Sequence, residues 1–228
     1  TARSGINMSG GQFLVGTGVT IGVAGVATFR SGRIDVGDAG NNTSIGEGAG
    51  DAITTGSGNV AVGKNALTAT TTGNNNTSVG NETLEANTTG AQNTAVGRRA
   101  LEANTTASYN TGIGYQSLLV NTTGASNTAV GHDSLVANTT GSNNTAIGRR
   151  ALNANTTANN NTALGRDTLL ANTTGTSNVA VGAYALDANT TANNNTALGY
   201  NALSANTTGV NNTAVGQGAL VTNSTGSN

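Results

Sequence analysis

The chain repeats the motif Asn-Thr-Ala-Val-Gly, with small variations, at every seventeenth residue from Asn42 onward. Eleven units follow one another without an insertion or a deletion, and each unit begins with Asn and has Gly at its fifth position. A short, fixed period of this kind is typical of a solenoid, in which each repeat forms one coil and contacts its neighbours. Counted from its first Asn, each unit has positions 1 to 17, so that Asn144 is position 1 of the seventh unit.

The length and composition of the unit predict β structure. Seventeen residues are too few for a helix–turn–helix repeat, which needs about 34, but they suit one coil of a parallel β-solenoid. Asn, Thr and Gly are poor helix formers, whereas Thr, Val and Ile favour strands. We therefore expect an all-β fold. Residues 42–228 should form a parallel β-solenoid, or β-roll, of eleven coils, and residues 1–41 a Gly/Val-rich β segment that acts as a shaft or connector.

Within each coil we expect two short strands. The first should cover positions 2 to 4, as in Thr145–Ile147, and the second positions 8 to 11, as in residues 151–154. Alanine replaces glycine at position 15 in three units, so we do not expect left-handed geometry there. Glycine at position 5 should form the corner between the strands, where positive φ or a close backbone approach excludes a Cβ. These corner glycines include Gly97, Gly131 and Gly165.

Both faces of the predicted strands are apolar. Ala146 and Ile147 are neighbours in the first strand and should point to opposite faces, as should Ala151 and Leu152 in the second. One face can fill the interior of the coil, but the other needs a second wall. A thin coil in a chain with two Phe, four Tyr and no Trp cannot supply that wall itself. Closed homo-oligomers are the usual solution, and we expect a homotrimer.

Stacking in register should place equal positions of successive coils above one another. The asparagines at position 12 would then form an amide ladder, in which each side chain bonds to the next one along the stack. The Asn-Thr-Thr triplets also match the N-glycosylation signal, but glycans one coil apart would collide. We therefore favour the ladder, whose members include Asn104, Asn121, Asn138, Asn155 and Asn172.

Composition and charge exclude several classes of partner. Only 8% of residues are charged and the net charge is −1, which gives no long-range attraction for nucleic acid or anionic membrane. The absence of cysteine excludes disulfides and thiolate metal sites, and no apolar run is long enough to span a bilayer. We expect no nucleic-acid partner, no membrane insertion, no cofactor and no metal. Asp35 and Asp38 beside glycines could bind calcium, but a simple turn is the favoured interpretation because the acidic pattern does not repeat.

Sequence variation concentrates at positions 6, 7 and 10, which we expect to face water. Position 7 should stack Asp133, Arg150 and Asp167 with alternating charge. Exposed Arg and Tyr are common where proteins recognise glycans or other proteins, although a solvated ridge with no ligand is the interpretation that the sequence alone favours. The candidate contact ridge comprises Arg98, Arg99, Tyr115, His132, Arg149, Arg150, Arg166, Tyr184 and Tyr200.

Candidate catalytic groups are few. The only histidine, His132, lies beside Asp133 and Ser134, but at a corner the three side chains should point in different directions. Glu85 and Glu102, at position 10 of adjacent coils, should face solvent. We expect no catalytic residues and no enzymatic activity.

The repeat strings resemble those of a known class of proteins. NTAVG, NTAIG and NTALG, each followed by two residues and Ala-Leu or a variant of it, resemble the head repeats of YadA-like trimeric adhesins, of the form SVAIGxxSxAxGxxA. The longer form with NTTG is similar to repeats of bacteriophage tail fibres, and GTGVTIGVAGVATF resembles the shaft segments of such fibres. The resemblance implies trimers carried on a virion or outside a cell.

Together these features predict a structural protein of a phage tail fibre, located on the virion, that extends or presents a host-binding end. Expected partners are other virion or fibre proteins at either end of the rod, one of which would cover the last coil, and a host surface glycan or protein. The alternative is a bacterial trimeric surface adhesin or an extracellular filament subunit. A glycan-cleaving tailspike enzyme is a third class, but it would need a longer coil and a cleft with paired carboxylates.

Overall fold

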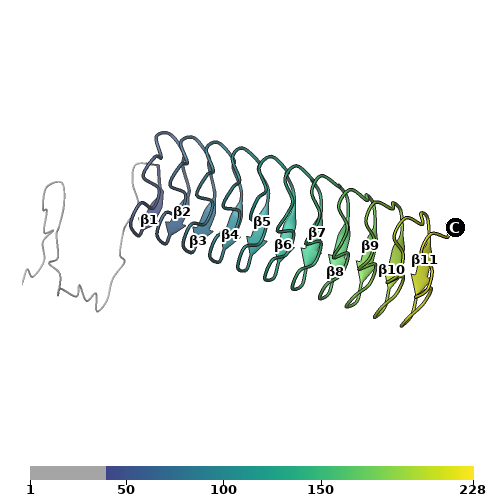
Figure 1. Cartoon of the computed structure of the whole chain (residues 1–228). Helices are drawn as coiled ribbons and strands as arrows, with labels where there is room; N and C mark the ends of the chain where they lie inside the picture. Colours follow the sequence, from purple (N-terminus) through teal and green to yellow (C-terminus); the bar gives the residue numbers. More distant parts are fainter. Residues whose placement is uncertain (1–39) are drawn as a thin grey trace, which may run out of the picture. The chain divides into compact units, whose positions relative to one another are not determined.

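The computed structural model describes residues 40–228, which form one stack of parallel coils (Figure 1). Each coil contributes one three-residue strand at positions 2 to 4, and the strands pair in chain order into an 11-stranded parallel sheet. Each strand residue lies beside its equivalent in the next coil, as Ala146 lies beside Ala163. The predicted all-β parallel solenoid is confirmed. The strands are β1 (Thr43–Ile45), β2 (Val60–Val62), β3 (Thr77–Val79), β4 (Thr94–Val96), β5 (Thr111–Ile113), β6 (Thr128–Val130), β7 (Thr145–Ile147), β8 (Thr162–Leu164), β9 (Val179–Val181), β10 (Thr196–Leu198) and β11 (Thr213–Val215).

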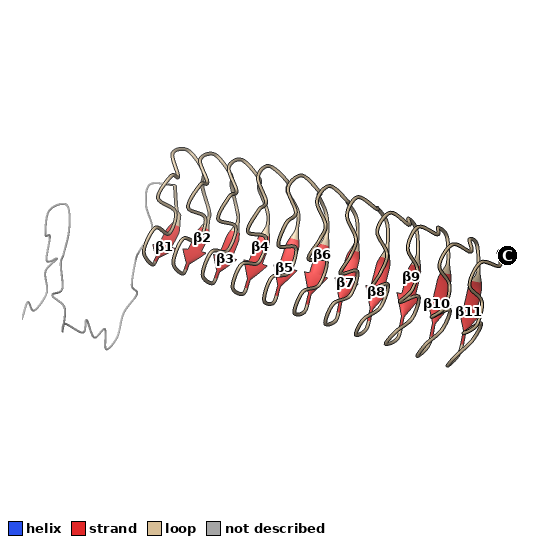
Figure 2. Cartoon of the chain, in the orientation of Figure 1, coloured by secondary structure: helices blue, strands red, loops and turns tan. Residues whose placement is uncertain are grey.

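All eleven strands lie on one side of the stack, and the rest of each coil is turn and loop (Figure 2). In the described part of the chain there is no helix long and apolar enough to cross a membrane. The Gly/Val-rich segment expected at 1–41 lies almost entirely outside the described residues, as do the calcium candidates Asp35 and Asp38.

The prediction of a second strand in each coil is wrong. Residues 151–154 form a turn, and the residues at positions 7 and 9 have positive φ, 55° at Arg150 and 50° at Leu152. A strand would send Ala151 and Leu152 to opposite sides. Here both side chains are fully buried, because the left-handed backbone at position 9 bends the chain and directs both of them inward.

Hydrogen bonds between coils continue through these turns. The Leu152 N–H donates to the Thr168 carbonyl oxygen at 3.0 Å, and the Arg150 N–H donates to the His132 carbonyl oxygen at 3.0 Å. Backbone groups in the turns are therefore satisfied by the neighbouring coil, as they are in the sheet.

The core is a column of one Ala at position 3 and one Leu at position 9 from nearly every coil. Leu152 is fully buried, with Leu135 and Leu169 at the same position of the adjacent coils. Left-handed φ costs a non-glycine residue roughly 1–2 kcal/mol, and full burial of a leucine contributes about 1.5–3 kcal/mol. Burial thus offsets the backbone strain. In the last coil Leu220 is 49% exposed.

Two ladders of buried asparagine run through the stack. At position 1, the Asn161 N–H donates to Asn144 Oδ1 at 3.0 Å, and Asn144 Nδ2 donates across its own coil to the Ala158 carbonyl oxygen at 2.8 Å. At position 12, Asn155 Nδ2 donates to Asn138 Oδ1 at 2.8 Å and also to the Ala158 carbonyl oxygen at 3.2 Å. The ladders thus converge on the position-15 carbonyl and fix the distance between strand and turn.

The position-12 ladder links successive coils along most of the stack. Contacts between consecutive members measure 2.7–3.1 Å from Asn104 to Asn172. Each of these asparagines is fully buried, so a glycan could not be attached to any of them in the folded coil. The linked members are Asn104, Asn121, Asn138, Asn155 and Asn172.

The position-5 glycines occupy a conformation that other residues rarely adopt. Gly97, Gly131 and Gly165 have φ of 126°, 137° and 136°. A Cβ added to Gly131 would lie 2.6 Å from the Gly148 carbonyl oxygen in the next coil. The close approach of successive corners therefore requires glycine at this position. Glycine at position 15, as at Gly141, has no positive φ, in keeping with the alanines found there in other coils.

Candidate functional site

Two surfaces of the stack stand out, and the first is the outer face of the sheet. Within a strand, position 3 points inward while positions 2 and 4 point outward, so position 4 presents a branched aliphatic side chain in every coil. Ile147 is 38% exposed and Leu164 43%. At about 4.8 Å per coil this row extends roughly 48 Å from β1 to β11. The aliphatic row comprises Ile45, Val62, Val79, Val96, Ile113, Val130, Ile147, Leu164, Val181, Leu198 and Val215.

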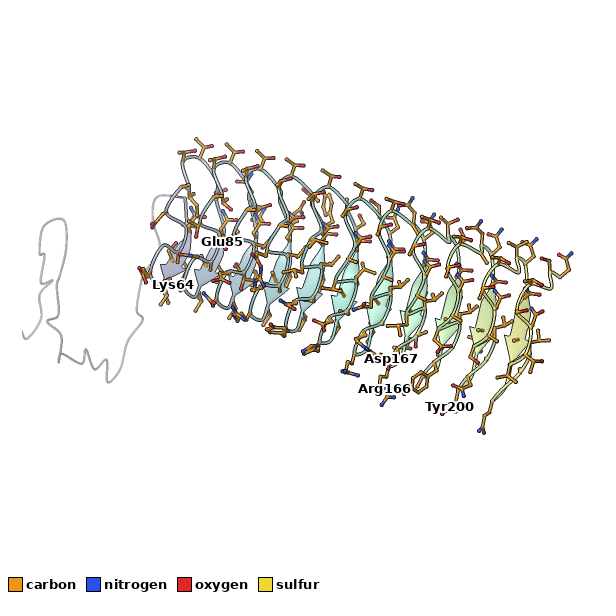
Figure 3. All side chains as sticks on the ribbon, viewed as in Figure 1. Lys64, Glu85, Arg166, Asp167 and Tyr200 are labelled. Carbon is orange, nitrogen blue, oxygen red and sulfur yellow. The ribbon has the colours of Figure 1, made fainter. Side chains whose placement is uncertain are left out.

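The second surface follows the corner after the strands and carries the predicted contact ridge. The position-6 members of the ridge are exposed, and Figure 3 shows Arg166 and Tyr200 along the same edge of the stack as Lys64, which is also at position 6. The exposed members are Arg98, Tyr115, His132, Arg149, Arg166 and Tyr200.

The position-7 members do not lie free in water, contrary to expectation. Arg99, Arg150 and Tyr184 are half-buried, and the Asp167 side chain is only 3% exposed. Position 10 is also partly buried, as at Glu102. The reason is the turn: positive φ at position 7 directs its side chain along the stack, where it contacts the adjacent coils.

Aromatic and cationic side chains of the ridge contact one another between coils. The Tyr115 and His132 rings are stacked with centroids 5.0 Å apart, and the Arg98 guanidinium lies 6.0 Å from the Tyr115 centroid. Further along, the Arg166 guanidinium lies 4.7 Å from the Tyr184 centroid, and Tyr184 meets Tyr200 edge to face at 6.0 Å. These contacts hold the polar edge in a defined arrangement.

Ion pairs link the charges of adjacent coils. Arg150 Nε donates to Asp167 Oδ1 at 2.8 Å, and Arg166 Nε lies 3.2 Å from Asp167 Oδ2. Arg99 forms a bidentate pair with Glu102 in its own coil. Of the alternating stack expected at position 7, only the Arg150–Asp167 contact is a direct bond, because Asp133 instead contacts His132 Nδ1 at 3.0 Å.

These surroundings move the pKa of two carboxyl groups in opposite directions. The hydrogen bond from Arg150 lowers the pKa of Asp167 below its usual range. Burial raises the pKa of Asp187, whose Oδ1 is buried without a hydrogen-bond partner. Removal from water disfavours the charged form, whereas a nearby guanidinium favours it.

The candidate catalytic groups named from the sequence each contact other partners in the structure. Ser134 is buried and its hydroxyl donates to the Gly131 carbonyl oxygen at 3.3 Å, whereas His132 contacts Asp133. Glu102 is paired with Arg99, and Glu85 accepts a hydrogen bond from Asn65 at 3.4 Å. Between residues 40 and 228, no group of three or more His, Cys, Asp or Glu side chains could hold a metal ion.

Sequence reasoning missed one exposed aromatic residue. Tyr109, at position 17, is 61% exposed and lies at a different corner from the ridge. Position 17 has positive φ, 64° at Tyr109, and the frequent asparagines there are the signal that could have identified an exposed left-handed corner.

No protein-family model, curated protein or solved structure matches this chain.

Proposed function

We propose that the chain is a rod-forming segment of a bacteriophage tail fibre, assembled as a homotrimer, that extends or presents the host-binding end of the fibre. The observation that carries the proposal is the aliphatic row. It is a continuous apolar strip on the outer face of the sheet. Long exposed apolar strips mark interaction surfaces, and a parallel sheet is normally covered on both faces.

The energy of covering the row is of the right size for self-association. In seven coils this side chain is 36–67% exposed, and in the other four it is less exposed. Full burial of a branched aliphatic side chain contributes about 1.5–3 kcal/mol, so covering an exposed fraction of about 40% recovers about 0.6–1.2 kcal/mol in each of the more exposed coils. Eleven coils therefore recover at most about 7–13 kcal/mol per chain on the same scale. The entropy cost of association is estimated at about 4–15 kcal/mol. The row is therefore adequate for assembly only when most of the coils take part, which favours parallel copies in register.

The number of copies and the biological setting are supported by the resemblance of the repeats to trimeric adhesin heads and phage fibres. A stiff rod keeps a binding element at a distance from its anchor, and three copies present each contact three times. The alternative, a bacterial trimeric surface adhesin, uses the same rod for the same mechanical purpose.

A substitution in the row tests the proposed assembly. We expect Ile147→Asp to raise the concentration needed for assembly more than tenfold, because a charge in a covered apolar strip loses its water. Tyr109→Asp, which introduces the same charge at an exposed residue of another corner, is the matched control and should assemble normally. Light scattering of the whole chain over a dilution series gives the measurement. Equal assembly of both variants would contradict the proposal.

A second experiment separates the phage fibre from the adhesin. Antibodies against the chain should label purified virions in electron micrographs. Labelling of the bacterial surface in uninfected cultures would instead support the adhesin.

A further inference from the structure

Charge is unevenly distributed along the stack. Residues 93–177 contain five arginines against three carboxylates, whereas residues 42–92 contain one lysine against four carboxylates, and residues 178–228 contain only the acidic Asp187. All five arginines are at positions 6 and 7. The ridge therefore carries a positive segment over the coils of β4 to β8, flanked by coils that are negative.

Most carboxylates in this segment are already engaged by the half-buried side of the ridge. Glu102 is bound by Arg99, and Asp167 is bound by Arg150 at 2.8 Å and by Arg166 at 3.2 Å. Of the outer arginines, Arg166 therefore shares a carboxylate, whereas Arg98 and Arg149 are less neutralised. Arg149 forms no ion pair with any of residues 40–228. Arg98 donates from Nε to Asn81 Oδ1 at 3.3 Å and lies 3.8 Å from Glu82 through Nη2. Guanidinium groups with free N–H donors thus face solvent in the coils of β4 and β7.

Aromatic rings fill the intervals between these cations. Tyr115 and His132 occupy the two coils between Arg98 and Arg149, and Tyr200 lies two coils beyond Arg166. At about 4.8 Å per coil, the strip from Arg98 to Tyr200 is roughly 29 Å long. Apart from Arg149, its members make ring or cation–π contacts within the ridge, so a ligand would meet a surface that is already largely ordered.

We propose that this strip binds an acidic polysaccharide lying parallel to the stack of coils. Guanidinium groups bind carboxylate or sulfate oxygens through paired hydrogen bonds, and the apolar faces of sugar rings pack on aromatic side chains. The inference rests on the proposed function in that it identifies the ligand class of the host-binding fibre, but the binding itself requires only the strip.

The same residues fit a polysaccharide better than a single-stranded nucleic acid. Nucleic acid carries a charge on every nucleotide, and its affinity depends on many phosphate contacts. Three outward arginines spread over five coils match a polymer of lower charge density.

Four probes test the inference on the whole chain: polygalacturonate oligosaccharides, which carry carboxylates; dextran sulfate; neutral dextran; and single-stranded oligothymidylate. Calorimetry should detect binding of at least one of the two acidic polysaccharides and none of neutral dextran. The comparison between them shows whether carboxylate or sulfate is preferred. Tighter binding of oligothymidylate than of either acidic polysaccharide would overturn the inference.

Variants place the binding on the strip. Arg149→Gln combined with Arg166→Gln should weaken binding about tenfold or more, and Tyr115→Ala about threefold. Lys64→Gln removes the same charge at the same position of the coil of β2, and Tyr109→Ala removes an exposed tyrosine at another corner. Both controls should bind within about twofold of the unchanged chain. Unchanged melting temperatures establish that the variants are folded.

The outcomes separate this inference from the proposed assembly. A trimer that binds neither acidic polysaccharide would overturn the inference and leave the rod intact. A monomer that binds one of them would support the strip and contradict the trimeric fibre. Weakening by Lys64→Gln that matches the paired arginine substitutions per charge removed would show that binding follows net charge alone, and this too would overturn the inference.

Discussion

Removal of one core leucine should show how strongly each coil depends on its neighbours. Leu152 is fully buried between the leucines of the adjacent coils, and the other core side chains around it are alanines. Alanines are too small to close the space left by Leu152→Ala. The cost should therefore lie in the upper part of the range for buried Leu→Ala substitutions, about 3–5 kcal/mol. Alanine and leucine both carry a Cβ and are equally strained at the φ of 50° found at this position. Backbone strain therefore does not change the expected loss of stability.

Leu220→Ala is the matched control, since it is the same substitution at the same position of the last coil. Leu220 is 49% exposed and has φ 50°, so we expect a loss of no more than about 1.5 kcal/mol. Urea unfolding followed by circular dichroism, at one fixed chain concentration, gives the two free energies of unfolding. Hydrogen exchange should also show faster opening of the coils next to Leu152. Equal costs at the two sites would refute the assignment of the leucine column as the core.

Three further predictions test other parts of the coil. Gly131→Ala should lower the melting temperature more than Gly216→Ala, because both need positive φ but only the first places a Cβ 2.6 Å from a carbonyl oxygen, whereas nothing lies within 4 Å of the second. Asn138→Ala should cost about 1–3 kcal/mol for each ladder partner left unsatisfied, whereas Asn223→Ala in the exposed last coil should cost less, as thermal unfolding can measure. Asp167→Asn should lower the free energy of unfolding at pH 7, because the Arg150 contact stabilises only the ionised carboxylate, and this difference should disappear as the pH falls through the lowered pKa of Asp167. Asp187→Asn should raise the free energy of unfolding at pH 7, because burial disfavours the ionised carboxylate, and this difference should disappear below the usual aspartate pKa of about 3.9. Melting curves from pH 2 to 7 that show the same difference at every pH would contradict both assignments.

The sheet and its register follow directly from the sequence. A constant period without a gap leaves one way to align Thr145 with Thr162, and the Thr-Ala-Ile pattern requires Ala146 to lie between two outward side chains. The asparagine ladders follow from the same period, since a buried amide at a fixed position must meet its copy one coil away.

The turn at positions 7 to 9 could not be derived from the apolar pattern. Ala151 and Leu152 read equally well as part of a strand, and only the left-handed backbone at position 9 makes both point inward. The signal lies in the first coil, which has Gly48 and Gly50 at positions 7 and 9, with φ of 71° and 67°. Glycine at these positions indicates the backbone that the later coils adopt with larger side chains.

The sequence predicts which residues line the ridge but not how deeply each side chain is buried. Stacking by coil places Arg98, Tyr115 and His132 in one line, as the period implies. The half-buried position of Arg150 and the burial of Asp167 depend on the turn that the sequence did not reveal. The separation into an outer, solvent-facing strip and an inner set of ion pairs is therefore a result of the structure.

The mass of the intact assembly tests the central claim most directly, namely that the aliphatic row is covered by further copies of the same chain. Native mass spectrometry of the whole chain should give three times the mass of the single chain, which is 22.2 kDa. Ile147→Asp should shift the mass toward that of one chain. A stable, folded species with the mass of a single chain at micromolar concentration would contradict the account.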